Sequence, residues 1–190
     1  MIESGVEKRV LVVAGLAVSL FPIVYLHVVS IGRLNPIRHT ISDYVFVDGG
    51  ASMLAATALT LAAASTVLLL SLRDVGRSAS WLMGLWAAGL TVATIFPTDP
   101  DGVPTSFSGL VHRYAGAVMF VSLPLAGLLI SRRCPKLRRL AILSGGASAA
   151  FLVSHVSING FAARGLAERV LFAVLYGLLF TLATQMRRTS

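Results

Sequence analysis

Three titratable side chains lie where apolar stretches of the chain begin or end, and they are the first candidates for chemistry. Asp99 follows one apolar stretch, His112 precedes the next, and His155 interrupts a third near its end. A carboxylate and two imidazoles can serve as general acid, general base or metal ligands when a fold holds them together in a shielded place. We therefore treat Asp99, His112 and His155 as candidate catalytic residues.

A second polar group lies in a connection between the first two apolar stretches. Pro36 disfavours helical backbone at the residue before it and suits the first position of a helix, which predicts a short interfacial or re-entrant helix from about Pro36 to Phe46. As a lid over the mouth of a bundle, this segment would offer candidate substrate-binding residues, namely Asn35, Arg38, His39, Ser42, Asp43 and Tyr44. It would equally serve as an amphipathic connector with an aromatic anchor.

Each candidate also has a purely structural interpretation. Asp99 precedes Pro100 in a turn rich in proline and glycine, where an aspartate commonly caps nearby amides. His155 lies four residues before Asn159, and polar residues at this spacing often hydrogen-bond between membrane helices, for about 0.6 kcal/mol each. Several apolar stretches that each bring such a residue to one depth are more than packing requires.

The elements that must position these residues are helices long enough to cross a bilayer. The chain has 190 residues, of which 56% are hydrophobic and 13% charged, and its mean hydropathy is +0.82, which excludes a soluble globule and a disordered chain. A spanning helix needs roughly 20 apolar residues. Six stretches qualify, at about residues 10–31, 51–72, 79–97, 114–131, 140–158 and 170–186.

We therefore expect an all-α fold, a polytopic membrane helix bundle that forms a single integral membrane domain over residues 1–190. Backbone amides in lipid must be satisfied within their own segment, so the six stretches have to be helices. The connections are mostly short, which makes consecutive helices antiparallel neighbours. The single cysteine, Cys134, excludes an internal disulfide and a cysteine-rich metal centre.

The distribution of basic residues predicts the orientation of this bundle. With a cytoplasmic N-terminus, 11 of the 16 Lys and Arg residues fall on the inner side. The other five fall on the outer side, and they are Arg33, Arg38, Arg113, Arg164 and Arg169. This bias favours both termini in the cytoplasm. The net charge of +8 is thus mainly a topology signal, and we expect membrane lipids and no nucleic acid as partners.

The same orientation places all four histidines and most acidic residues on the outer side, at the extracytoplasmic face of a cell membrane. We therefore expect a polar pocket at that face. The sequence leaves the oligomeric state open, with a homo-oligomer among the possibilities, and it identifies neither a cofactor nor a metal.

The segment from Asn35 to Tyr44, the motif Phe96-Pro97-Thr98-Asp99 at the end of a span, and His112 at the start of the next together resemble the bacterial membrane family known as domain of unknown function 998. The resemblance covers nearly the whole chain, including the plan of six spans. It implies a multi-pass protein of the bacterial plasma membrane, and it supplies no reaction.

A looser likeness is to the membrane ceramidases and related receptors, whose seven-helix cores hold zinc with a serine, an aspartate and histidines. Ser42, Asp43, Asp99, His112 and His155 are of these types. The chain departs from that pattern in having six spans and no pair of histidines four residues apart on one helix.

Three functions are consistent with this pattern. The first is a membrane protein of unknown biochemical activity whose outer pocket binds a lipid or another amphiphile. The second is a membrane-embedded enzyme, in one version metal-dependent, that acts on a lipid or an isoprenoid. The third is a haem-binding membrane protein with His112 and His155 as axial ligands.

Overall fold

The computed structural model describes residues 2–72, 75–156 and 163–185, and within these ranges the chain is helical and contains no strand. Its long helices are α1 (Ile2–Val29), α2 (Gly50–Ser71), α3 (Arg77–Ile95), α4 (Phe107–Ser131), α5 (Arg138–Val156) and α6 (Arg164–Gln185). All six contain a stretch long and apolar enough to cross a membrane. This confirms the predicted all-α bundle, and the chain is a multi-pass membrane protein. Asn159 lies outside the described residues.

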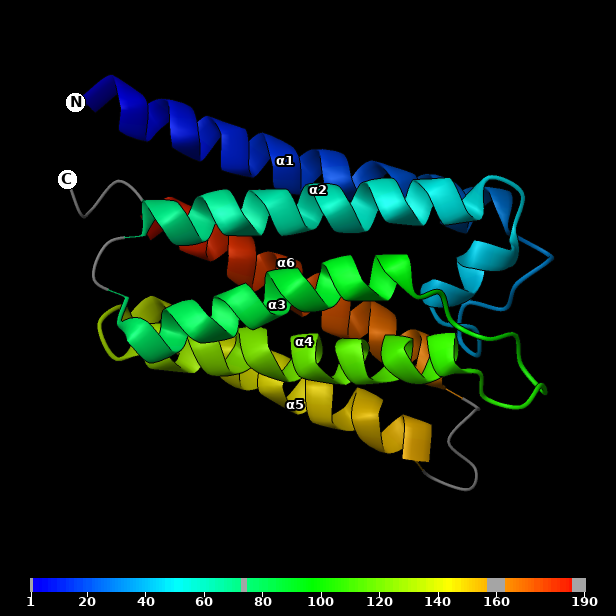
Figure 1. The fold of residues 1–190 in the computed structure, drawn as a ribbon. Coiled ribbons are helices and arrows are strands. Elements are labelled where there is room, and N and C mark those ends of the chain that lie inside the picture. Colours follow the sequence, from blue (N-terminus) through cyan, green and yellow to red (C-terminus); the bar gives the residue numbers. More distant parts are fainter. Residues whose placement is uncertain (1, 73–74, 157–162, 186–190) are drawn as a thin grey trace.

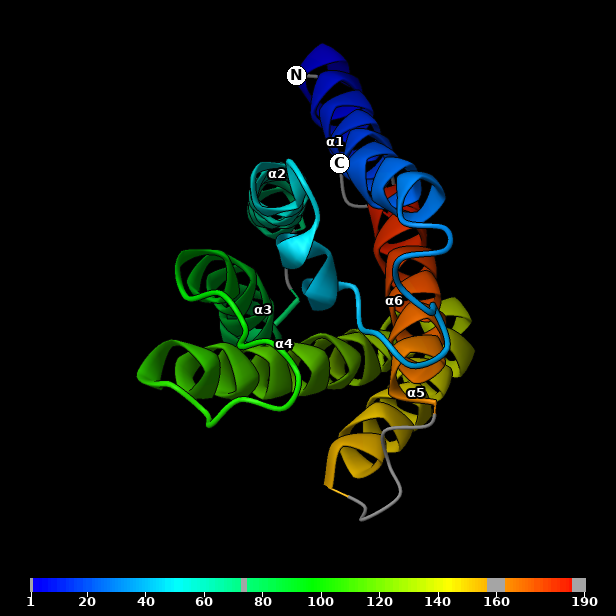
Figure 2. The same cartoon turned by 90° about the vertical axis from the view of Figure 1, so that its right-hand side faces the viewer.

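Consecutive helices pack side by side and run antiparallel, and α6 returns to pack against α1 (Figure 1). The six helices thereby form a closed ring in chain order. We call the end at which α2, α4 and α6 begin the polar end of the bundle. Two connections at this end belong to the part of the chain that the structure describes, the first loop (residues 30–49) and the second loop (residues 96–106). Seen toward this end, a short 3-10 helix of the first loop, η1 (Ser42–Phe46), projects between α2 and α6 (Figure 2).

The core forms where the helices meet, and it is almost entirely apolar. Several of its buried hydroxyl groups bond to a backbone carbonyl of their own helix, as Ser144 Oγ does to the Ala141 carbonyl at 3.0 Å. Other polar contacts join two helices, as when Trp86 Nε1 donates a hydrogen bond to Ser65 Oγ at 3.0 Å. The outward faces are apolar as well, because Phe21 on α1 is 71% exposed and Leu70 on α2 is 79% exposed. Apolar side chains on both the inner and the outer faces are what a helix bundle in lipid requires.

Helix α4 begins at Phe107, before the apolar stretch that was expected to start at residue 114. Ser106 caps the helix, because its Oγ accepts the Gly109 N–H at 3.1 Å. The Asp99 carboxylate in turn accepts the Ser106 N–H at 2.8 Å and the Ser106 O–H at 2.6 Å. This pair of caps fixes the end of the second loop, and it places His112 inside the helix instead of ahead of it.

The first loop differs from the expected helix over Pro36–Phe46, since only η1 is helical and the residues before it form turns. The backbone carbonyls of those turns face α6. The Ile37 carbonyl accepts the Leu166 N–H at 3.1 Å, and the carbonyls of Pro36 and His39 accept hydrogen bonds from Arg169 Nη1. No backbone N–H of the loop bonds to these three carbonyls, so they close no helical turn there.

A glycine allows the first loop to come this close to α6. A Cβ built on Gly165 would lie 2.1 Å from the His39 carbonyl oxygen and 2.7 Å from that of Pro36. Real Cβ atoms do not approach oxygen so closely, so any side chain at this position forces the loop and the helix apart.

We expect Gly165→Ala to lower the midpoint of thermal unfolding in detergent, followed by circular dichroism, because the added methyl group separates the first loop from α6. Gly177→Ala on the same helix is the matched control, since the nearest atom to its new Cβ is 3.9 Å away and alanine is the better helix former. Equal midpoints for the two variants would show that the docked loop contributes nothing to stability.

Candidate functional site

The polar end of the bundle contains a cavity of about 800 Å³, which we call the main cavity. All six helices and both loops contribute to its lining. Its apolar walls come largely from α2, α3 and α4, and they include Leu54, Ala55, Leu61, Leu90, Met119 and Phe120. Its polar lining includes Asp43, Asp99, His112, His155, Arg164 and Glu168. The volume falls within the range of about 300 to 1,000 Å³ that is usual for small-molecule sites.

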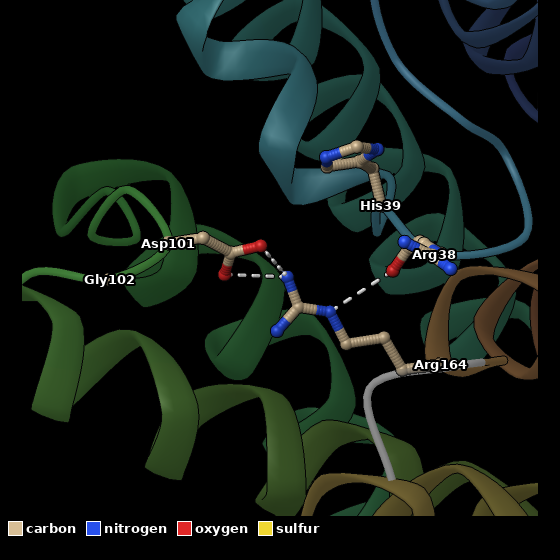
Figure 3. A pocket seen from close by; sticks show the side chains of 5 residues that line it. All are labelled: Arg38, His39, Asp101, Gly102 and Arg164. Carbon is tan, nitrogen blue, oxygen red and sulfur yellow. Dashed lines mark hydrogen bonds and ion pairs between the residues drawn. The ribbon is translucent and has the colours of Figure 1, made fainter. Parts of the chain in front are cut away.

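Arg164, the first residue of α6, connects the two loops (Figure 3). Its Nη2 donates to the two carboxylate oxygens of Asp101 in the second loop, at 2.7 and 2.6 Å. The same Nη2 lies 3.5 Å from Oδ2 of Asp43 in the first loop, and Nε donates to the Arg38 carbonyl at 3.1 Å. A single guanidinium therefore holds both loops over the cavity.

The two carboxylates that face Arg164 differ in their burial. The Asp43 side chain is 8% exposed and also accepts the Thr40 N–H at 2.6 Å, whereas the Asp101 side chain is 56% exposed. A buried carboxylate is costly unless a positive charge and hydrogen bonds compensate it, whereas an exposed ion pair contributes about 1 kcal/mol or less. Asp43 therefore depends on Arg164, and Asp101 is held only weakly.

Glu168, one turn further along α6, is a second buried carboxylate on the same face. It is 5% exposed, and its Oε2 accepts the N–H of Ile41 in the first loop. A carboxylate within an apolar span is tolerated where it faces protein and has a donor, and the loop amide supplies one. The first two turns of α6 thus hold the first loop through both Arg164 and Glu168.

Tyr44 connects the loop to two helices through its hydroxyl group, which accepts a hydrogen bond from Arg169 Nη2 at 2.8 Å and lies 2.8 Å from His27 Nδ1. Because a guanidinium only donates, the Tyr44 oxygen accepts from Arg169, and the Tyr44 proton remains available for His27 Nδ1. Tyr44 is 2% exposed and does not line the main cavity. Its place is that of a buried support for the loop.

Asp99 lines the main cavity, and its carboxylate is already engaged in the cap of α4. Hydrogen bonds from the side chain and the backbone N–H of Ser106 hold the pKa of Asp99 below its usual range. A carboxyl group with a lowered pKa is ionised at neutral pH and is a poor proton donor. This geometry favours a positioning role for Asp99 or the role of a hydrogen-bond acceptor.

His112 is fixed between α3 and α4. Its Nδ1 lies 2.9 Å from the Phe96 carbonyl oxygen and 3.1 Å from that of Ala93, and because carbonyls only accept, Nδ1 carries a proton. In the neutral ring Nε2 then has a free lone pair. His155 also lines the cavity, with its ring 4.6 Å from that of Phe151, centroid to centroid.

The described part of the chain contains no cluster of three His, Cys, Asp or Glu side chains that could hold a metal ion. Asp99, His112 and His155 line one cavity, but the geometry of a metal centre is not formed among them. Structural zinc needs four close ligands and catalytic zinc at least three.

The remaining candidates fall in different places. Ser42 lines the main cavity and lies 2.8 Å from the Thr40 hydroxyl, oxygen to oxygen. Arg38 and His39 line a smaller cavity of about 400 Å³, the outer hollow, together with Asp101, Gly102 and Arg164. Asn35 lies on the exposed surface and forms a turn, since its Oδ1 accepts the Ile37 N–H at 2.9 Å.

Sequence reasoning missed the residues that hold the site together. Arg164 and Arg169 were counted only as outer basic residues, and Asp101 and Glu168 were not selected as candidates. A signal for them exists, because two arginines at the outer end of a span oppose the positive-inside bias, and charged side chains in apolar spans are costly unless they are paired.

Comparison with known proteins gives one result that bears on the whole chain. A family model described as "Protein of unknown function (DUF998)" matches residues 12–185. No curated protein and no solved structure is significantly similar to the chain.

We expect Arg164→Gln to destabilise the protein strongly, on the order of 3 to 5 kcal/mol, because it leaves the buried Asp43 carboxylate without its counter-charge. Asp101→Asn should cost about 1 kcal/mol or less, because that carboxylate is largely exposed and Asp43 keeps its partner. Unfolding of both variants in detergent, monitored by circular dichroism, gives the comparison. A larger loss for Asp101→Asn would contradict the assignment of Asp43 as the dependent carboxylate.

Proposed function

We propose that this chain, which belongs to the DUF998 family of proteins of unknown function, binds a lipid or another amphiphile in its main cavity. The observation that carries the proposal is the polarity of the cavity lining. Leucine, alanine, methionine and phenylalanine side chains form one part of the lining, and acidic, basic and imidazole groups form the other. An apolar chain with a polar head matches both parts, whereas a wholly polar solute would leave the apolar walls without partners.

The way the cavity is covered also supports an amphiphile. The first loop folds back toward the bundle and is held on α6 by Arg164, Glu168 and Arg169, so that Ile41 and Asp43 are buried. A covered cavity shields the apolar part of a ligand from water. The polar head of the ligand would reach the surface beside Asp101, whose side chain is exposed.

We further propose that the polar end faces the extracytoplasmic side of a cell membrane. The proposal rests on the basic residues, 11 of which fall on the opposite side and five at this end. A ligand would then enter from the outer leaflet.

An enzyme that acts on the bound amphiphile is the second candidate. The observation that favours it is the fixed ring of His112, a residue that lines the cavity. In the neutral ring, its Nε2 has a free lone pair. Such a group suits a general base. Haem binding remains a prediction supported only by the shared cavity of His112 and His155.

A cavity-filling pair of variants tests the binding proposal. Ala55 lines the main cavity, whereas its neighbour Ala56 is exposed and does not. We expect Ala55→Phe to reduce binding of a pyrene-labelled single-chain lipid at least about tenfold, because the new ring takes the volume of the chain, and Ala56→Phe to bind normally. Fluorescence anisotropy of the purified protein measures both. Equal binding by the two variants would exclude the main cavity as the site.

The orientation is tested with cysteines added to a Cys134→Ser background. Asp48 in the first loop is fully exposed, and Lys136 is exposed at the opposite end, in the short 3-10 helix η2 (Pro135–Leu137). In intact cells, a membrane-impermeant maleimide should label the Asp48→Cys variant, and it should label the Lys136→Cys variant only after lysis. The reverse pattern would place the polar end in the cytoplasm.

A further inference from the structure

The outer hollow adjoins the main cavity, and the two share part of their lining. Asp101, Gly102 and Arg164 line both. Arg38 and His39 line the outer hollow alone. Figure 3 shows the Arg164 guanidinium between Asp101 on one side and Arg38 with His39 on the other. A ligand whose chain occupies the main cavity would therefore bring its head to this hollow.

The carboxylates around the two cavities already have donors. Asp43 and Asp101 face Arg164, Asp99 accepts two hydrogen bonds from Ser106, and Glu168 accepts an amide of the first loop. A cationic head would have to compete with these donors.

The basic side chains at the rim are less engaged. Arg38 and Arg113 are exposed, and their side chains form no hydrogen bond or ion pair with the described residues. His39 also lies at the rim, and its Nδ1 contacts the backbone of Asn35, 2.9 Å from the nitrogen and 3.2 Å from the carbonyl oxygen, which leaves Nε2 as the ring nitrogen for a ligand. Among the described residues, the charge at the mouth that has no ion-pair partner is therefore positive.

The Asp101 carboxylate is an example of an anion bound by Arg164 at the outer hollow. Both of its oxygens lie within 2.7 Å of Arg164 Nη2, although its side chain is 56% exposed. Guanidinium groups bind phosphate oxygens as they bind carboxylate oxygens. Arg164 would not lose all its negative partners if Asp101 moved away, because Asp43 stays 3.5 Å from the same nitrogen.

We propose that the outer hollow binds the phosphate group of an anionic amphiphile, with Arg38, His39 and Arg164 as donors and with Asp101 as the carboxylate that the phosphate displaces. The inference rests on the proposed function, because it assigns the chain of the same ligand to the main cavity. The alternative source of the same chemistry is free phosphate, which lacks a chain and leaves the apolar walls unused.

The experiment is displacement of the pyrene-labelled lipid in a maltoside detergent, which carries no phosphate. The competitors are dodecyl phosphate, dodecanol and inorganic phosphate. We expect dodecyl phosphate to displace the probe at a concentration about tenfold below that of dodecanol, since charged hydrogen bonds are added to the same chain. Inorganic phosphate should displace little.

Three variants locate the phosphate. The Arg38→Gln variant should bind dodecyl phosphate about tenfold more weakly than the wild type, and it should bind dodecanol equally well. Arg33→Gln is the matched control, because Arg33 is an exposed arginine of the same loop that lines neither cavity, and it should change neither competitor. Asp101→Asn should strengthen the binding of dodecyl phosphate, because the competing carboxylate is removed. Loss of a merely structural side chain would not strengthen it.

The failures are distinguishable. Equal displacement by dodecanol and dodecyl phosphate, unchanged in Arg38→Gln, would overturn the phosphate site while leaving the amphiphile cavity in place. Displacement by inorganic phosphate as effective as that by dodecyl phosphate would assign the hollow to free phosphate. If the wild-type protein does not bind the pyrene-labelled lipid, and neither alkyl compound changes the anisotropy signal, the proposed function itself is overturned.

Discussion

The polar end of this bundle depends on one positive charge at the start of its last helix. Arg164 lies within reach of a carboxylate from each loop and of a loop carbonyl, and its side chain is only 10% exposed. A buried guanidinium of this kind is stable only while a negative partner faces it, and the carboxylates that do so here lie far away along the chain. The packing of six helices forms the ring, but this charge fixes the loops that cover it.

The proposed function follows from what those loops enclose. Membrane helices need small and apolar side chains in order to pack, and such a bundle would ordinarily fill its own interior. Here the first loop comes between the ends of α2 and α6, and a cavity of about 800 Å³ remains beneath the loops with apolar walls and a polar mouth. Neither the apolar walls nor the polar mouth alone would suggest an amphiphile, and it is their continuity that supports the proposal.

The fold was readable from the sequence because the bilayer imposes a simple rule. Stretches of about 20 apolar residues must be helices, and this rule gave the six helices of the bundle. The first loop was less predictable. Pro36 and the polar spacing after it predicted a helix, but the loop carbonyls bond to Arg169 and to the Leu166 amide, which are more than 120 residues away along the chain. Local patterns contain no information about such contacts.

For the candidate residues too, the sequence predicted some features and missed those that depend on distant contacts. Asp99 was proposed for chemistry and accepts hydrogen bonds from Ser106, the N-cap of α4, whereas Arg164, which was counted only as a topology charge, organises the site. His112 lies on the cavity lining, as its position at the start of a span allowed, but the bond that fixes its ring comes from the end of α3. Sequence identifies the residue types, and tertiary contacts assign their roles.

The most direct test of an amphiphile in the main cavity is photo-crosslinking with a lipid that carries a diazirine near the end of its single chain. Peptides from the labelled protein are then mapped by mass spectrometry. We predict crosslinks to the cavity-facing residues Leu61, Leu90 and Phe120, which lie on three different helices. Crosslinks confined to outward-facing side chains such as Phe21 and Leu70 would contradict the proposal, because they would show that the lipid only surrounds the bundle.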